Sequence, residues 1–328
     1  MTKIFLTRMI PGPALKELKN RKSLQIDIYE KDQKISHQEL LKRVKGIDIL
    51  IPLLTEKIDA QVMDAAGPQL KLISNYSVGF DNVDLEEAKK RGINVTNAPC
   101  CESSESVAEH AIAFIFALSH RIVEADAFVR SGKYKGWDPN LLTGTDLLGK
   151  TVGIVGSGRI SSAIARRLHD GFGVKIIYTD IKRNKDFEKA YKAKYKTKEQ
   201  LLKEADVVSL HVPLLPSTRH LISTKEFKLM KKTAFLVNTS RGPIVDELAL
   251  IKALQKKQIG GAALDVYECE PSIDCNPRDN YELRKQPNVI LTPHIASSTI
   301  EARQMMTTVV VKNVLAYLNK KSLPNKVA

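Results

Sequence analysis

Thr151-Val152-Gly153-Ile154-Val155-Gly156-Ser157-Gly158-Arg159-Ile160-Ser161 is the stretch that decides the fold of this chain. Its first five residues predict a buried strand, and residues 163–168 predict a helix. Between them, one glycine permits a tight turn and the next lets the backbone approach a pyrophosphate at the positively polarised start of the helix. The stretch therefore predicts a dinucleotide-binding fold, with cofactor contacts from Gly156, Gly158, Arg159 and Ile160.

Two residues qualify this motif. Ser161 stands where the usual pattern has a third glycine, and it adds a small side chain where helix and strand pack closely. Asp180 ends the next predicted strand, where its carboxylate can accept hydrogen bonds from the hydroxyls of an adenosine ribose. It would repel a 2′-phosphate, although Lys182 and Arg183 lie close enough in sequence to compensate. We expect NAD as the cofactor, with NADP as the alternative.

Short apolar strands alternate with helical or turn-rich segments along the whole chain. Such alternation predicts right-handed crossovers and parallel sheets. We therefore predict an α/β fold of two doubly wound domains, one flavodoxin-like and one Rossmann-like, with a cleft between them. Residues 1–103 plus 297–328 form the predicted substrate-binding domain, and residues 104–296 the NAD(P)-binding domain. The predicted strands are 3–7, 25–29, 47–53, 70–75 and 93–96, then 151–155, 174–179, 206–211, 234–238, 261–266 and 288–292.

Two long helices are also predicted. Ser106 and Glu109 have the spacing of a capping box, so a helix should begin near Ser106. The apolar run 111–118 that follows leaves no polar face, and we expect it to be buried between domains or subunits. Residues 299–318 predict a second helix that returns to the first domain, with Met305, Val309, Leu315 and Leu318 as its apolar residues.

Composition excludes several classes of protein. The chain is 43% hydrophobic and 27% charged, as globular proteins are, and its longest apolar run of eight residues is too short to cross a bilayer. Its first residues resemble a strand rather than a secretory signal, so we expect a cytoplasmic protein without a membrane partner.

The formal charge of +14 would suit a nucleic-acid partner if the basic residues were clustered on a binding module. Nine basic and three acidic residues fall between Lys182 and Lys203, without the glycines or the base-stacking platform of a known binding module. We interpret this stretch as a solvated face and expect no nucleic acid. The cysteines at 100, 101, 269 and 275 have neither zinc-site spacing nor disulfide-scaffold density, and we expect reduced thiols.

Three segments that each follow a predicted strand carry the candidate chemistry. They are residues 237–243 with Arg241, residues 264–271 with Glu270, and residues 291–298 with His294. In open α/β sheets, ligands bind at the carboxyl ends of the strands.

Together these segments resemble the Arg, Glu and His motifs of the D-isomer-specific 2-hydroxyacid dehydrogenases, and the resemblance spans nearly the whole chain. Within that family, residues 75–84 and 134–139 look most like those of glyoxylate and hydroxypyruvate reductases. The resemblance implies a hydride transfer from NAD(P)H to a small 2-keto acid, giving the D-2-hydroxy acid.

The residue types suit this reaction on chemical grounds. Arg241 offers a planar, permanently charged fork that can bind a carboxylate and polarise the keto oxygen. His294 can protonate that oxygen, and Glu270 can hold the imidazole in one tautomer and favour its protonated form. We expect these three residues to be catalytic.

The resemblance implies further site residues. Ser77, Val78 and Gly79 would present backbone N–H groups to the substrate carboxylate, and Trp137 would close the site of a neighbouring subunit in a homodimer. Asp265 would lie near the nicotinamide and the catalytic pair. The remaining cofactor contacts are expected from Pro213, Thr218 and Thr239. The histidines at 110, 169, 211 and 220 have no telling partner in the sequence, and we interpret them as structural or exposed. No metal-ligand cluster is apparent.

Three alternatives remain open at this point. The same family contains phosphoglycerate and phosphite dehydrogenases, and residues 125–132 also look like the latter enzyme. The fold is also used by NAD-sensing transcriptional corepressors. An intact set of Arg241, Glu270 and His294 argues for an enzyme.

Overall fold

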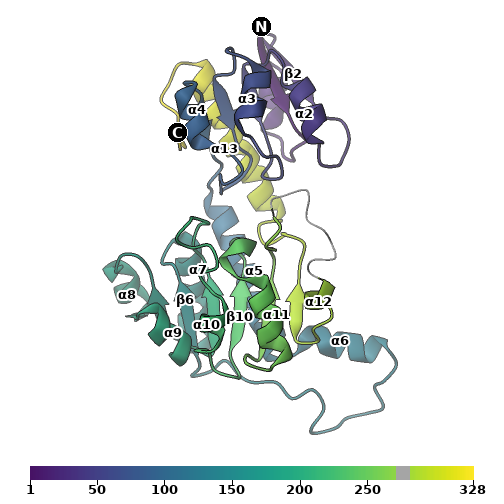
Figure 1. Ribbon diagram of the computed structural model, residues 1–328, viewed down its shortest axis with the longest axis vertical. Coiled ribbons are helices and arrows are strands. Elements are labelled where there is room, and N and C mark those ends of the chain that lie inside the picture. Colours follow the sequence, from purple (N-terminus) through teal and green to yellow (C-terminus); the bar gives the residue numbers. More distant parts are fainter. Residues whose placement is uncertain (271–280) are drawn as a thin grey trace. The chain divides into compact units, whose positions relative to one another are not determined.

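The computed structural model describes residues 1–270 and 281–328, which divide into two compact units (Figure 1). The first unit contains Met1–Ser103 and Ser298–Ala328. The second contains Ser104–Glu270 and residues 281–297. Each unit has its own parallel sheet with helices around it, so the predicted α/β fold with two parallel sheets is confirmed.

The first unit has a five-stranded sheet in the order β2-β1-β3-β4-β5. Its central strands β3 and β4 are short and wholly buried, because helices cover both faces of a parallel sheet. The side chains of Ser36, Asp59 and Asp84 each accept a backbone N–H and so begin the helix that follows. The elements are β1 (Thr2–Leu6), α1 (Leu15–Lys19), β2 (Leu24–Ile28), α2 (His37–Arg43), β3 (Ile49–Ile51), α3 (Ala60–Ala66), β4 (Leu72–Ser74), α4 (Leu85–Lys90), β5 (Asn94–Thr96) and α13 (Ile300–Leu318).

Helix α13 packs against α1 and β4 of this first unit. Thr299 caps it, as the sequence boundary predicts. The predicted apolar residues Met305, Val309, Leu315 and Leu318 pack against the core and are partly buried. The fully buried apolar residues of the helix are Met306, Val310, Val311 and Val314, which the sequence did not single out. A helix that is apolar over most of its surface gives little signal about which side meets the sheet.

The second unit has a seven-stranded parallel sheet in the order β12-β11-β10-β9-β6-β7-β8. Strand β8 is not predicted by the sequence, because it has two exposed residues within a lysine-rich run. The strands are β6 (Thr151–Val155), β7 (Lys175–Thr179), β8 (Lys194–Tyr195), β9 (Val207–Leu210), β10 (Phe235–Asn238), β11 (Gly261–Leu264) and β12 (Val289–Leu291). The helices are α5 (Cys101–Ser119), α6 (Ile122–Arg130), α7 (Arg159–Phe172), α8 (Lys185–Tyr191), α9 (Lys198–Glu204), α10 (Thr224–Phe227), the 3-10 turn η1 (Gly242–Ile244), α11 (Glu247–Gln255) and α12 (Tyr281–Arg284).

Helix α5 begins at Cys101, five residues before the predicted capping box. The N–H of Ser103 donates to Cys100 Sγ at this start, and Ser106 lies inside the helix. Glu109 does not cap the helix but pairs with Arg167 at 3.0 Å. The helix start predicted near Ser106 from the Ser-x-x-Glu spacing is therefore wrong. The same spacing also occurs by chance on the surface of a helix. The apolar run is partly buried, and Ala113 within it is exposed.

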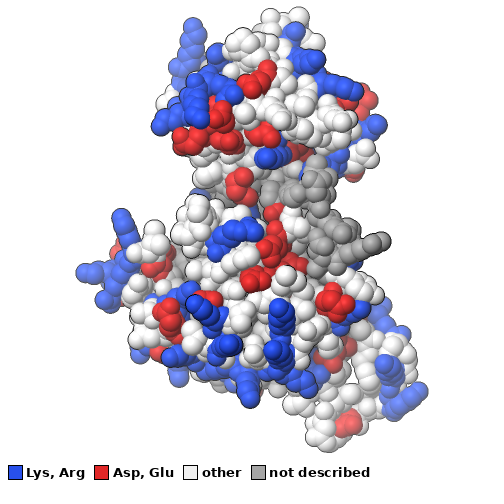
Figure 2. Space-filling view, in the orientation of Figure 1, with Lys and Arg blue, Asp and Glu red and all other residues white. Residues whose placement is uncertain are grey.

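Basic residues are interspersed with acidic ones on the face shown in Figure 2. Within the lysine-rich stretch, Lys196 pairs with Glu204 and Lys198 pairs with Glu226. Part of the positive charge that the sequence concentrates here is thus balanced locally in the fold. None of the helices in the described ranges combines the length and the apolar character that crossing a bilayer requires.

Candidate active site

The turn between β6 and α7 has the geometry of a pyrophosphate cradle. Gly156 adopts a φ of +96°, and a Cβ there would lie 2.6 Å from the carbonyl oxygen of His211, so only glycine fits. Gly158 begins α7, and a Cβ built on it would meet no described atom within 4 Å. The space above the helix N-terminus is therefore open to an anion. Arg159 is exposed in the first turn, and Ile160 packs partly against the core.

Asp180 follows β7 and points to the same turn. Its Oδ2 accepts hydrogen bonds from Ser157 N at 2.7 Å and Ser157 Oγ at 2.6 Å. A pocket of about 430 Å³ opens beside it. The pocket is lined by Ser157, Asp180, Lys182, Arg183, Asn184, Lys185 and Asp186.

Ser161, which replaces the third glycine, is fully buried within α7. Its hydroxyl has no hydrogen-bond partner among the described residues. The serine is therefore tolerated by the packing of helix on strand, at the cost of a buried polar group without a partner.

The other predicted cofactor positions lie on neighbouring loops. Thr239 follows β10 and is buried, and the part of the chain that the structure describes supplies no partner for its hydroxyl. Thr218 instead closes the loop after β9, because its hydroxyl donates to the Pro213 carbonyl at 2.7 Å and accepts from Leu215 N at 2.8 Å. Three features of this edge of the sheet fit a bound dinucleotide. They are the unpartnered Thr239 hydroxyl, the open space at Gly158 and the pocket beside Asp180.

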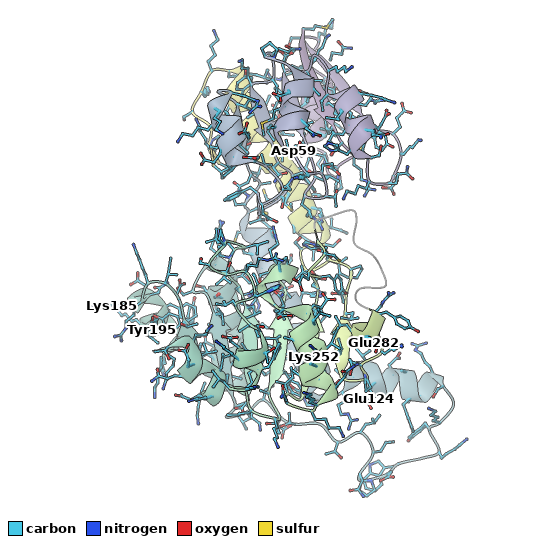
Figure 3. All side chains as sticks on the ribbon, viewed as in Figure 1. Asp59, Glu124, Lys185, Tyr195, Lys252 and Glu282 are labelled. Carbon is cyan, nitrogen blue, oxygen red and sulfur yellow. The ribbon has the colours of Figure 1, made fainter. Side chains whose placement is uncertain are left out.

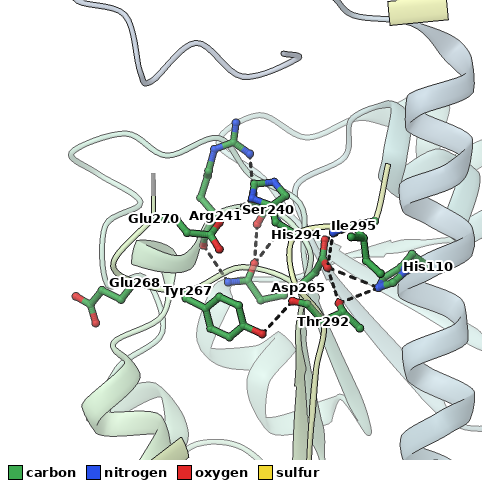
Figure 4. A network of polar contacts seen from close by, with 12 residues as sticks. His110, Ser240, Arg241, Asp265, Tyr267, Glu268, Glu270, Thr292, His294 and Ile295 are labelled. Atoms are coloured by element: carbon green, nitrogen blue, oxygen red, sulfur yellow. Dashed lines mark hydrogen bonds and ion pairs between the residues drawn. The ribbon is translucent and has the colours of Figure 1, made fainter. Parts of the chain in front are cut away.

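The three predicted catalytic residues follow three adjacent strands. In β10, β11 and β12, the last paired residues are aligned as Asn238, Leu264 and Leu291. Arg241, Glu270 and His294 come a few residues later, at the same edge of the sheet (Figure 4). The backbone at Gly242 packs so closely on Tyr267 and Glu268 that a Cβ there would overlap them, which holds these segments together.

His294 and Glu270 form a hydrogen-bonded pair, with His294 Nδ1 2.7 Å from Glu270 Oε2. The side chains of both residues are 25% exposed. Because a carboxylate only accepts, Nδ1 carries the hydrogen and Nε2 is left to face a substrate. His294 has a φ of +58°, a strained value for a residue with a side chain.

Arg241 is half-buried on extended backbone directly before η1. Its Nη1 donates to the Ser240 carbonyl at 2.8 Å, and its own carbonyl accepts from Asn238 Nδ2 at 2.9 Å. These contacts stiffen the loop that carries the guanidinium.

Asp265 anchors the segment that bears His294. It is fully buried and accepts hydrogen bonds from Ile295 N and Ala296 N, both at 2.8 Å. The Thr292 hydroxyl donates to the same carboxylate, and His110 Nε2 lies 3.2 Å from that hydroxyl. Sequence reasoning placed Asp265 near the catalytic pair but missed Thr292 and His110, because their contacts join residues 182 positions apart.

Burial perturbs two side chains of this network. It lowers the pKa of His110, although the nearby Asp265 carboxylate acts in the opposite direction. Burial also raises the pKa of Tyr267 to about 12, so this hydroxyl stays neutral and donates to the Thr292 carbonyl at 2.9 Å. His110 and Tyr267 therefore contribute neutral side chains to this network at neutral pH.

The loop of Ser77, Val78 and Gly79 belongs to the first unit. The carbonyls of Val78 and Gly79 accept from the side chains of Asn97 and Asn75, at 2.7 and 3.0 Å. Within the described ranges, the N–H groups of Val78 and Gly79 have no acceptor. The loop therefore holds its carbonyls inward and leaves N–H donors for an anion.

Trp137 is 84% exposed, on the segment that follows α6. It lies outside the hydrophobic cores of the described residues.

The expectation of four reduced cysteines is wrong for Cys269, which is disulfide-bonded. Cys100 and Cys101 are not disulfide-bonded, as expected. A single bond requires only two cysteines whose Cα atoms come within about 7 Å, which neither spacing nor density in the sequence reveals. Cys275 and Pro271 lie outside the described residues. In the described ranges, no group of three or more His, Cys, Asp or Glu side chains is arranged to hold a metal ion.

Known proteins place this geometry in a family. The NAD-binding domain of the D-isomer specific 2-hydroxyacid dehydrogenases matches residues 112–296. The chain belongs to this family. The dehydrogenase is 48% identical to the glyoxylate reductase of Thermofilum pendens, over 98% of this chain and 93% of that one. It is 47% identical to the glyoxylate reductase of Thermococcus litoralis, over 99% and 96% of the two chains.

A crystal structure of a Thermus thermophilus protein superimposes on this dehydrogenase with a TM-score of 0.90 and 41% identity, covering all of both chains. The family establishes an NAD(P)-dependent dehydrogenase. The matched NAD-binding domain includes the turn of Gly156 and Gly158, so the cofactor of this turn is NAD(P). Arg241, Glu270 and His294 lie in the same domain.

Proposed function

We propose that this dehydrogenase works as a 2-keto-acid reductase that converts glyoxylate or hydroxypyruvate to the corresponding D-2-hydroxy acid, with NADH as the preferred donor. The observation that carries the proposal is the 2.7 Å bond between His294 Nδ1 and Glu270 Oε2, at the strand edge that also carries Arg241. The relatives named glyoxylate reductase support this choice of substrate.

Arg241, His294 and Glu270 divide the work of the reaction. The bound dinucleotide supplies a hydride to the keto carbon. Arg241 binds the substrate carboxylate through its guanidinium and polarises the keto oxygen. As negative charge develops on that oxygen, His294 donates the proton on Nε2. Glu270 keeps Nδ1 protonated and stabilises the imidazolium before the transfer. In the oxidative direction, His294 Nε2 accepts the proton from the hydroxy acid.

A substrate panel followed by NADH absorbance tests the proposal. Glyoxylate and hydroxypyruvate should be reduced fastest, ahead of pyruvate, whereas phosphite and 3-phosphoglycerate should support little NAD reduction. Arg241→Ala and His294→Ala should each lose roughly 10²- to 10⁴-fold in kcat/KM. Arg219→Ala is a matched control on an exposed arginine. Binding of NADH without turnover of any 2-keto acid would favour a nucleotide-sensing role and overturn the proposal.

We also propose a division of labour between the units. The first unit, residues 1–103 and 297–328, binds substrate, and the N–H donors at Val78 and Gly79 are suited to a carboxylate. The second, residues 104–296, binds the cofactor. The match of the NAD-binding domain to residues 112–296 supports this assignment.

A homodimer is the proposed assembly, in a cytoplasmic location. Helix α6 buries none of its residues in its own unit, and Ile122, Val123 and Val129 are each more than half exposed. A groove of about 730 Å³ lies beside it. The groove is lined by apolar side chains that include Leu118, Val123, Ala127, Leu147, Val289 and Ile290.

A second copy is the natural cover for these surfaces, because an exposed apolar face next to a groove is typical of an interface. Trp137 would then lie at the neighbouring subunit, as the family resemblance implies. Sedimentation should give a dimer at micromolar concentration. Val123→Glu should shift it toward monomer, whereas Asp126→Asn, on the same helix but outside the groove lining, should not. A monomeric wild-type protein would overturn the assignment.

A further inference from the structure

The pocket beside Asp180 has a basic rim. Lys182, Arg183 and Lys185 all line it, and Lys185 lies at the start of α8 (labelled in Figure 3). The Tyr195 hydroxyl donates to the Asp180 carbonyl at 3.3 Å, which ties β8 to the strand end. A rim of this composition raises the question of why the pocket would prefer a ribose hydroxyl to a phosphate.

The single arginine of the rim is held by Glu188 on α8. Arg183 Nε donates to Glu188 Oε1 at 2.7 Å, and Nη2 donates to Oε2 at 2.8 Å. This is the bidentate arrangement, which matches the planar guanidinium to both carboxylate oxygens. Glu188 itself is 18% exposed, and Arg183 is 61% exposed.

Glu188 is in turn fixed from the sheet side. The Tyr178 hydroxyl donates to Glu188 Oε1 at 2.8 Å, and Asn184 N donates to that hydroxyl at 2.7 Å. Hydrogen bonds from Arg183 and then Tyr178 lower the pKa of Glu188 to about 2. The carboxylate is therefore ionised at neutral pH, where it can pair with Arg183.

A 2′-phosphate is recognised best by the same bidentate fork that Glu188 occupies. Lys182 and Lys185 also line the pocket, but a lysine is a point charge and provides no fork. Asp180 lines the same pocket, and its carboxylate would place a second negative charge beside the 2′ oxygen of a bound ribose. Two carboxylates thus oppose a phosphate, one by repulsion and one by occupying the guanidinium.

We infer that Glu188 is a second determinant of cofactor specificity, which withholds Arg183 from a 2′-phosphate and acts together with Asp180 to favour NADH over NADPH. The two acids should be coupled. With Asp180 present, releasing Arg183 brings little gain, because the phosphate still meets a carboxylate. With Asp180 removed, the released guanidinium can bind the phosphate in full.

The inference rests on the cofactor class and not on the identity of the keto acid, so binding tests it without turnover. Titration calorimetry of adenosine 2′,5′-bisphosphate and of 5′-AMP separates the phosphate from the rest of the nucleotide. Asp180→Ala should raise the affinity for the bisphosphate roughly tenfold relative to that for 5′-AMP. Glu188→Gln alone should raise this relative affinity only about twofold. In the double variant, the gain in relative bisphosphate affinity should exceed the product of the two single gains by at least about fivefold. The NADPH to NADH ratio of kcat/KM should follow the same order.

Glu204→Gln is the matched control. Glu204 lies on α9, pairs with Lys196 and does not line the pocket. This variant changes the net charge equally and should leave both affinities unaltered. Glu188→Gln could instead weaken bisphosphate binding in the Asp180→Ala background. That result would mean that Glu188 orients Arg183 toward the phosphate, and the inference would be wrong. Simple multiplication of the two single effects would also refute it. Unchanged 5′-AMP binding in Glu188→Gln shows that the fold of the pocket is intact. Asp180→Ala should weaken 5′-AMP, because it removes the acceptor for the ribose hydroxyls, so the double variant is compared with Asp180→Ala.

Discussion

His294 and Glu270 are joined by a 2.7 Å hydrogen bond while the backbone of His294 is held at a φ of +58°. A left-handed backbone at a residue with a side chain costs on the order of 1 kcal/mol or more, and persists only where surrounding contacts impose it. Here the contacts are the two hydrogen bonds from the next residues, Ile295 and Ala296, to Asp265. The strained backbone therefore directs Nδ1 of the imidazole toward Glu270. Nε2, on the opposite side of the ring, points away from Glu270.

Glu270→Gln should abolish the preference for the Nδ1–H tautomer, because an amide can donate to the ring as well as accept from it. We expect kcat for keto-acid reduction to fall roughly 10²- to 10⁴-fold, with a much smaller change in NADH affinity. Steady-state kinetics and NADH fluorescence titration measure the two quantities. Glu282→Gln on α12 is the control. An equal loss in both quantities would mean that Glu270 holds the fold rather than the ring.

Thr292→Val should lower kcat between roughly tenfold and a hundredfold, because it removes the hydroxyl that joins His110 to Asp265 and loosens the His294 segment. The side chains are nearly equal in size, so the packing is preserved. The Thr292 hydroxyl gives its one proton to Asp265 and must accept from His110 Nε2, so His110→Phe should produce a similar loss.

Glutamine can still donate at that position, and His110→Gln should recover part of the rate. Thr308→Val, on the exposed side of α13, is the control. Full activity in Thr292→Val would show that the network has no part in positioning His294.

Ser161→Ala should stabilise the protein by about 1 kcal/mol, since it removes a buried hydroxyl that has no partner among the described residues. The increase in Tm should be about 2–4 °C for a unit of this size. Ser162→Ala, one residue along α7 and partly exposed, corrects for the higher helix propensity of alanine. Thermal and urea unfolding give the comparison. No gain beyond that of Ser162→Ala would mean that the hydroxyl is satisfied in solution.

His211 should make the protein less stable in acid. Burial lowers its pKa to about 3, and its Nδ1 has no partner among the described residues. Between pH about 6.5 and about 3, the unfolded chain binds a proton that the folded chain does not, so the free energy of unfolding falls as the pH falls.

His211→Gln should remove this component, which is at most about 1.4 kcal/mol per pH unit. Urea unfolding from pH 7 to pH 4 measures the slope, and His120→Gln on an exposed histidine should leave it unchanged. Identical slopes in wild type and His211→Gln would contradict the assignment.

Local patterns in the sequence determined the larger part of the fold. Strand period, glycine positions and the acidic residue after the second strand of the motif are properties of short segments, and β6, α7 and Asp180 lie where they predict. The same holds for Arg241, Glu270 and His294. Each follows a strand, and parallel strands bring their carboxyl ends to one edge of a sheet.

Contacts between distant residues were decided only by the tertiary structure. The start of α5 at Cys101, the core side of α13, the disulfide at Cys269 and the bond from His110 to Thr292 each depend on which segments meet in space. The pairing of Arg183 with Glu188 shows the limit most clearly. The sequence indicated a basic residue near Asp180, but whether its guanidinium is available is settled by the carboxylate it meets in the fold.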